Sequence, residues 1–243
     1  MRLTKVLKAT ISKDPQIEGS NEDSAVLRLF GNGQRAAVFD GASESFAARK
    51  WSRLLAGEWG RGVSLDDSWL ENAQSRYQAE MDALNLSWAQ EAAMERGSFA
   101  TIASIEVSDD FINVCIIGDS SVFFLDSRGV KSSLPFQSES QFSSAPLALS
   151  SRPTALEQNY ELIKSGKKRS GTFSKAIGER YVLLATDAVS CWLLSDDLST
   201  HLQRLNMLIS CKNAMEFQEL VLRERENGAM KIDDSTIILL RID

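Results

Sequence analysis

The stretch VFDGASES, residues 38 to 45, constrains the fold of this chain most strongly. Four apolar residues, 36 to 39, come directly before Asp40, and Gly41 follows it. An apolar run of this kind predicts a buried strand, which would hold the Asp40 carboxylate at the rim of the core. Gly41 has no side chain, so the backbone there can approach a ligand or metal closely. The stretch therefore predicts a carboxylate site at the end of a strand.

Carboxylates followed by small residues stand at other predicted strand ends too. They occur in Glu22-Asp23-Ser24, Gly118-Asp119-Ser120, Asp187-Ala188 and Asp233-Asp234-Ser235. A single one is ordinary as a turn residue or a helix cap. Several without a matching Lys or Arg repel one another, and such a cluster is most stable around divalent cations. An all-oxygen set favours Mg²⁺ or Mn²⁺.

Apolar runs predict eight strands. They are residues 3–11, 25–30, 34–39, 99–107, 111–117, 122–125, 181–185 and 236–242. A Gly31-Asn32-Gly33 turn would join the second strand to the third as a hairpin, which would bring Glu22 and Asp23 close to Asp40. The nearly continuous apolar run 111–117 implies cover on both faces, by helices outside and by another sheet within.

Apolar spacing of three and four residues predicts helices between these strands. They are residues 46–59, about 67–95 with a break near 85, 193–209 and 214–225. The second of them would place Trp69 and Trp88 on one apolar side. The mixture of strands and late helices predicts an α+β layered sandwich, with residues 1–243 as a single domain. Residues 131–175, rich in serine and proline, are expected to form a strand-poor flap.

Composition excludes several functional classes. With 33 acidic and 27 basic side chains the net charge is −6, so there is no electrostatic footprint for nucleic acid or anionic lipid. Cys115, Cys191 and Cys211 are scattered, which argues against a disulfide framework or a thiolate zinc site. The only histidine, His201, argues against histidine metal sites and a Ser-His-Asp triad. Residues 1–15 lack a signal-peptide core, so a cytoplasmic location is expected.

Positive charge concentrates in KSGKKRSG, between Lys164 and Arg169. Such a run favours a solvated loop, and the alternative is a surface that attracts a phosphorylated partner.

Six short motifs carry a resemblance to a known family. In chain order they are NED, VFDG, GSFAT, GDSSVFFL, ATDA and DDSTIILL, and they span about Asn21 to Leu240. This series resembles the metal-dependent Ser/Thr protein phosphatases of the 2C type (PP2C), particularly the bacterial members. The resemblance implies an antiparallel β-sandwich of two sheets flanked by α-helices, in four layers, with a binuclear metal centre at one end.

The resemblance also implies catalytic residues. Asp40 would bridge two metal ions, and the carbonyl of Gly41 would bind one of them. Asp187 and Asp233 would hold the other metal ion. The two metal ions, Mg²⁺ or Mn²⁺, would lower the pKa of a water that attacks phosphoserine or phosphothreonine directly.

Three further residues have implied roles. Glu22 would anchor the water shell of the first metal, with Asp23 beside it. Asp119 matches an aspartate associated with a weaker third metal. The partners implied are a phosphorylated protein substrate and a cognate Ser/Thr kinase.

One departure from the family pattern concerns the binding of the substrate phosphate. The family usually has an arginine five residues before the Asp of NED, where it grips the substrate phosphate, and this chain has Glu18 there. Lys13 or the basic segment near Lys167 would have to replace it. Glu18 therefore favours an alternative, a pseudophosphatase that keeps the fold as a phosphoprotein-binding module. In a third hypothesis the acidic residues are only loop chemistry on a structural protein.

Overall fold

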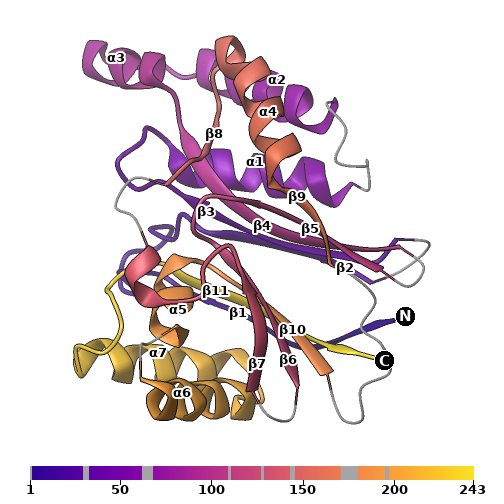
Figure 1. Ribbon diagram of the computed structural model, residues 1–243. Helices are drawn as coiled ribbons and strands as arrows, with labels where there is room; N and C mark the ends of the chain where they lie inside the picture. The colour runs from indigo at the N-terminus through magenta and orange to yellow at the C-terminus, as the bar shows by residue number, and fades with distance from the viewer. Residues whose placement is uncertain are drawn as a thin grey trace.

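The computed structural model describes residues 2–29, 33–61, 68–108, 111–126, 129–142, 146–170, 180–194 and 197–243. These residues form two antiparallel β-sheets that are stacked face to face, with helices on the outer face of each sheet (Figure 1). The expected α+β sandwich is confirmed.

Each sheet combines strands that lie far apart in the sequence. The first sheet has the order β1 (Leu3–Ile11), β11 (Ser235–Ile242), β10 (Arg180–Ala185), β6 (Ser121–Asp126) and β7 (Gly129–Leu134). The second has the order β2 (Ser24–Arg28), β3 (Arg35–Gly41), β4 (Phe99–Ser108), β5 (Phe111–Ile117) and β9 (Lys167–Ser170), and β8 (Leu149–Ser150) pairs with β4.

The helices divide between the two outer faces (Figure 1). On the side of the second sheet lie α1 (Ala48–Gly60), α2 (Ser68–Asp82), α3 (Trp88–Arg96) and α4 (Leu156–Gly166). On the side of the first sheet lie α5 (Asp187–Leu193), α6 (Leu198–Ser210) and α7 (Ala214–Glu226). Two short 3₁₀ turns, Glu139–Gln141 and Pro153–Ala155, complete the described elements.

Successive side chains of a strand point to opposite faces of its sheet, so the core has three layers. One lies between the two sheets, and one lies between each sheet and its helices. In β3, Ala36 and Val38 pack between the two sheets, whereas Ala37 and Phe39 pack against the outer helices. Both faces of such a strand are covered, which explains its continuous apolar sequence. The same division applies to β5, where Val114 lies between the sheets and Cys115 faces the helices. The cover predicted on both faces of residues 111–117 is therefore confirmed.

Two expectations about local structure are wrong. Residues 131–175, expected to be strand-poor, contain most of β7, all of α4 and β9, and the two residues of β8. The strand β9 lies at the edge of the second sheet. Trp88, expected on a buried face, is 83% exposed. The helix ends at Asp82 and a new helix begins at Trp88, so Trp88 does not continue the apolar face of Trp69.

Parts of some predictions lie outside the described residues. They are residues 30–32 at the predicted hairpin turn, residue 67 at the expected start of the second helix, residues 143–145 and 171–175 of the expected flap, and residues 195 and 196 of the helix expected at 193–209. Within the described ranges, no helix combines the length and the hydropathy that crossing a bilayer requires.

Candidate metal centre

The second sheet brings two acidic residues to one end of the sandwich. Alternation along β3 places Asp40 on the same face as Ala36 and Val38, toward the first sheet. Ser24 pairs with Phe39 across the hairpin, so Asp23, the residue before β2, adjoins Asp40. This strand pairing places the two carboxylates close together, as the hairpin predicts. Burial, and then the charge of Asp23, raise the pKa of Asp40.

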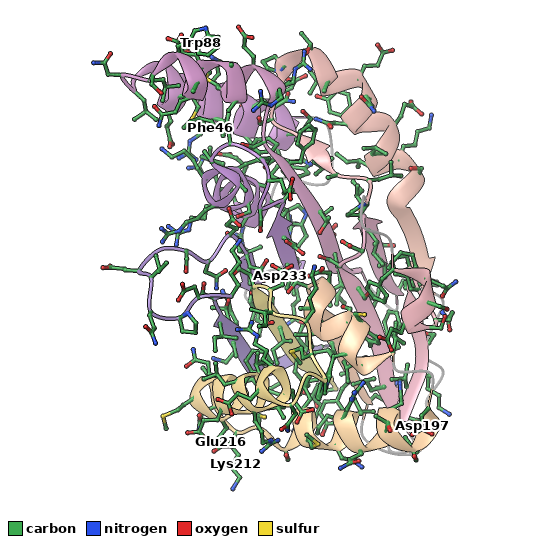
Figure 2. The ribbon with its side chains drawn as sticks, turned by 90° about the vertical axis from the view of Figure 1, so that its left-hand side faces the viewer. Phe46, Trp88, Asp197, Lys212, Glu216 and Asp233 are labelled. Carbon is green, nitrogen blue, oxygen red and sulfur yellow. The ribbon has the colours of Figure 1, made fainter. Side chains whose placement is uncertain are left out.

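The first sheet and the turn that links the sheets contribute three more aspartates at the same end. Asp187 follows β10 and begins α5, and Asp233 lies just before β11, whose Ile237 pairs with Ala185 of β10. Asp119 lies in the turn between β5 and β6. Figure 2 looks onto this end of the molecule and shows Asp233 near its middle, between the two helical layers.

Asp40 is the electrostatic centre of this group. Withdrawal from water, followed by the negative charges of Asp23, Asp187, Asp119 and Asp233, raises the pKa of the Asp40 carboxyl well above its usual value. Burial and the charge of Asp187 raise the pKa of Asp119 to about 7. Five carboxylates from five separate segments therefore act on one another at one end of the sandwich.

Two of these carboxylates carry an unpartnered oxygen. The Oδ2 atom of Asp23 accepts a hydrogen bond from the Thr186 hydroxyl at 3.0 Å, while its Oδ1 atom is buried without a hydrogen-bond partner. The Oδ1 atom of Asp119 is likewise buried without a partner. Asp23 is 7% exposed and Asp119 is 5% exposed. Buried carboxylate oxygens without donors are costly, and a bound cation satisfies them.

A lysine that the sequence analysis did not identify joins the group. The ammonium of Lys231 lies 3.1 Å from Asp187 Oδ2 and 2.6 Å from Asp233 Oδ2. Burial acts to lower its pKa, but the hydrogen bonds and charges of Asp233 and Asp187 outweigh burial and raise it, so the side chain stays charged. Its position in the sequence KIDD, two residues before Asp233, is the signal that marks it as a counter-ion.

Asp234 has a structural role that its neighbour Asp233 does not share. It is 3% exposed, and it accepts hydrogen bonds from the backbone N–H of Lys13 at 2.7 Å and of Glu22 at 2.6 Å. A third bond comes from the Ser12 hydroxyl at 3.4 Å. Asp234 therefore ties the start of β11 to the segment that carries Glu22.

Lys13 and Glu22 form an ion pair at the rim of the acidic group. The Lys13 ammonium lies 2.6 Å from Glu22 Oε2 and donates to the Ser43 hydroxyl at 2.6 Å. Burial acts to lower the pKa of Lys13, but the hydrogen bond with Glu22 and the charges of Glu22, Asp234 and Asp233 outweigh it and raise the pKa. Lys13 is thus next to the acidic group, as its suggested phosphate-binding role requires.

Gly41 lies where three parts of the backbone meet. A Cβ atom at this position would come within 2.8 Å of the Glu22 carbonyl oxygen and 3.0 Å of the Ala48 carbonyl oxygen. Only glycine lets β3 end this close to the segment before β2 and to the start of α1.

Within the described part of the chain, no three Asp, Glu, His or Cys side chains are positioned to hold a single metal ion. The donor set nevertheless fits a divalent cation. It consists of oxygens, it includes buried oxygens of Asp23 and Asp119 without partners, and its carboxylates repel one another. Lys231 supplies positive charge where Asp187 and Asp233 meet.

The sequence matches no protein-family model and no curated protein. Solved structures do match. The catalytic domain of the serine/threonine protein phosphatase PstP, in complex with two manganese ions, superposes with a TM-score of 0.59 at 16% identity, covering 100% of this chain and 98% of that one. The phosphatase Stp1 from Staphylococcus aureus gives the same values. RsbX in complex with magnesium gives a TM-score of 0.52 at 19% identity, covering 97% and 94%.

The chain has the PP2C-type phosphatase fold. The fold expected from the six motifs is therefore confirmed over the whole described sandwich, including its two sheets and flanking helices. Identities of 16–19% establish the fold alone.

One departure from the PP2C-type pattern is visible on the surface. Glu18, which stands where an arginine was expected, is exposed. The guanidinium of Arg49, from the first turn of α1, packs against the backbone of the adjacent Gly19, where it would clash with a Cβ atom. A positive charge is thus present beside the position of Glu18, but it comes from another element.

Proposed function

We propose that this protein is a Mg²⁺- or Mn²⁺-dependent phosphatase that removes phosphate from phosphoserine or phosphothreonine in proteins. The observation that carries the proposal is the convergence of four aspartates on Asp40 at one end of a PP2C-type fold. The manganese in PstP and the magnesium in RsbX support the choice of cation.

The proposal gives each carboxylate a role toward the cations. Asp40 would contact both cations, because it lies at the end of β3 among aspartates contributed by both sheets. The carbonyl of Gly41 would be a ligand of one cation. Asp187 and Asp233 would hold the second cation.

Asp119 and Asp23 supply buried oxygens that have no other partner, and we assign Asp119 to a third, weaker cation. Glu22, paired with Lys13, would fix the hydration shell of the first cation. Asp234 is excluded from this list because backbone donors already occupy both of its oxygens.

The charge of the group explains why a cation is needed. A phosphate ester is negative, and five neighbouring carboxylates repel it. Bound divalent cations supply charge neutralisation and a more acidic water for in-line hydrolysis. The carboxylates fix where that charge lies, and Lys13 at the rim is the residue that we propose contacts the substrate phosphate.

An assay of phosphate release tests this proposal. We expect purified protein to hydrolyse an aryl phosphate and a phosphoserine peptide with manganese, and chelation to abolish turnover. Asp40→Asn and Asp187→Asn should each lower kcat/KM at least 100-fold, because each removes a charge that positions a cation. Lys13→Ala should raise KM with a smaller effect on kcat. Turnover that survives chelation or either Asp→Asn change would contradict the proposal.

Glu18 supports a second candidate, a phosphoprotein-binding module without turnover. A carboxylate at that position repels a substrate phosphate, and Lys13 is already paired with Glu22. Calorimetry separates the candidates, since tight manganese binding combined with no phosphate release would favour the binding module.

A further inference from the structure

Lys231 joins two carboxylates that belong to different elements. It lies in the segment between α7 and β11, and its ammonium contacts Asp187 at the start of α5 and Asp233 just before β11. One lysine thus holds together two segments that the proposed function assigns to one cation.

The remaining oxygens of these two carboxylates are already fixed. Asp187 Oδ1 accepts a hydrogen bond from the backbone N–H of Ala188 at 2.6 Å, and Asp233 Oδ1 accepts one from the backbone N–H of Asp234 at 3.0 Å. Each carboxylate therefore has one oxygen on the backbone and its Oδ2 oxygen on the Lys231 ammonium. A divalent cation held by both residues through their Oδ2 atoms would compete with Lys231 for them.

An ammonium and a divalent cation cannot share these oxygens at close range, because their positive charges repel each other. The Lys231 side chain is 60% exposed, whereas those of Asp187 and Asp233 are 18% and 25% exposed. Lys231 can therefore turn toward water with little loss of burial, while the two carboxylates remain where their backbone hydrogen bonds hold them.

We propose that Lys231 is a built-in counter-ion that holds Asp187 and Asp233 together in the metal-free protein and competes with the divalent cation for them. This inference rests on the proposed function only in assigning these two aspartates to a cation. It follows that removing the lysine charge strengthens cation binding and at the same time weakens the metal-free fold.

The test is a manganese titration of Lys231→Gln by calorimetry, together with metal-free thermal unfolding. Glutamine keeps the length and polarity of the side chain and removes its charge. We expect the Kd for Mn²⁺ to fall about tenfold, as expected for losing a competing, partly exposed ion pair with two carboxylates. The metal-free melting temperature should fall as well. Lys231→Ala, a second neutral variant, should show the same two changes, and Lys231→Arg should bind Mn²⁺ as the wild type does.

The matched control is Lys131→Gln. Lys131 pairs with Asp126 at 3.2 Å, its side chain is 44% exposed, and Asp126 lies at the end of β6 away from the acidic group. This change should leave the Kd for Mn²⁺ unaltered.

The outcomes separate this inference from the proposed function. Manganese binding and turnover in the wild type, with equal or weaker binding by both neutral variants, would overturn the role of Lys231 and leave the phosphatase standing. Absence of manganese binding by the wild type and by all the variants would overturn both.

Discussion

Burying Asp119 in the acidic group makes the stability of the metal-free protein depend on pH. Burial first, and then the charge of Asp187, raise its pKa from 3.8 to about 7 in the folded state. Between these values the unfolded chain releases a proton that the folded chain retains, so the metal-free protein loses stability as pH rises from about 4 to about 7. Three pKa units correspond to on the order of 4 kcal/mol at most.

We therefore predict that the contribution of Asp119 makes the metal-free wild type more stable near pH 4.5 than near pH 7.5. Asp119→Asn should reduce this difference in stability. Urea unfolding at a series of pH values in the presence of a chelator measures it. If the stability of Asp119→Asn falls with pH as steeply as that of the wild type, the pKa of Asp119 is not the cause of this dependence.

Asp234 stabilises the fold, because both oxygens of its buried carboxylate accept hydrogen bonds from backbone N–H groups. Asp234→Ala should lower the free energy of unfolding by about 2–4 kcal/mol, since it leaves the N–H groups of Lys13 and Glu22 without an acceptor. Asp197→Ala is the control, because Asp197, labelled in Figure 2, is an exposed cap of α6. Its carboxylate accepts from the backbone N–H of Thr200, and its loss should cost clearly less than that of Asp234. Equal losses in the two variants would refute the structural role of Asp234.

At the scale of elements, the end of β3 is held against α1 through Gly41. We predict that Gly41→Ala destabilises the protein by about 1–3 kcal/mol and weakens manganese binding, because its Cβ would press on two backbone carbonyls. Gly57→Ala, in the middle of α1 with nothing within 4 Å of the added atom, should instead stabilise by up to about 1 kcal/mol. Denaturant unfolding compares them, and a neutral Gly41→Ala would contradict the close approach.

Strands were predictable from the sequence where apolar residues alternate with polar ones or form a continuous run. Residues 3–11 and 111–117 were expected as strands, and β1 and β5 have these bounds. The helix α4 was missed although Leu156, Tyr160 and Ile163 recur at helical spacing and pack in the cluster between the second sheet and its helices. The serine and proline residues of the range 131–175 favoured a loop instead. The sequence could not show that Asn159 exchanges hydrogen bonds with the backbone of Ser150.

The acidic residues at the site were predictable because each follows or precedes an apolar strand. The different roles of adjacent residues were not. Asp233 faces Lys231, whereas Asp234 is bonded to backbone N–H groups, and this difference depends on which way each side chain points at the start of β11.

At the scale of the whole molecule, cation binding should couple to stability, because both sheets contribute carboxylates to the site. At a Mn²⁺ concentration 100 times the Kd, the free energy of unfolding should rise by about 2.7 kcal/mol, and Asp40→Asn should remove most of this gain. Thermal unfolding with and without manganese measures the change. The structural-protein hypothesis predicts no stabilisation by divalent cations.

The central claim is that Asp40 organises a cation site where the two sheets meet. Anomalous diffraction at the manganese absorption edge from a manganese-soaked crystal tests it most directly. We expect anomalous peaks next to the Asp40 carboxylate, one of them between Asp187 and Asp233, with the Lys231 ammonium turned away. Peaks only in other parts of the molecule would contradict a cation site at Asp40. So would the absence of peaks together with a Lys231 ammonium that still contacts both aspartates.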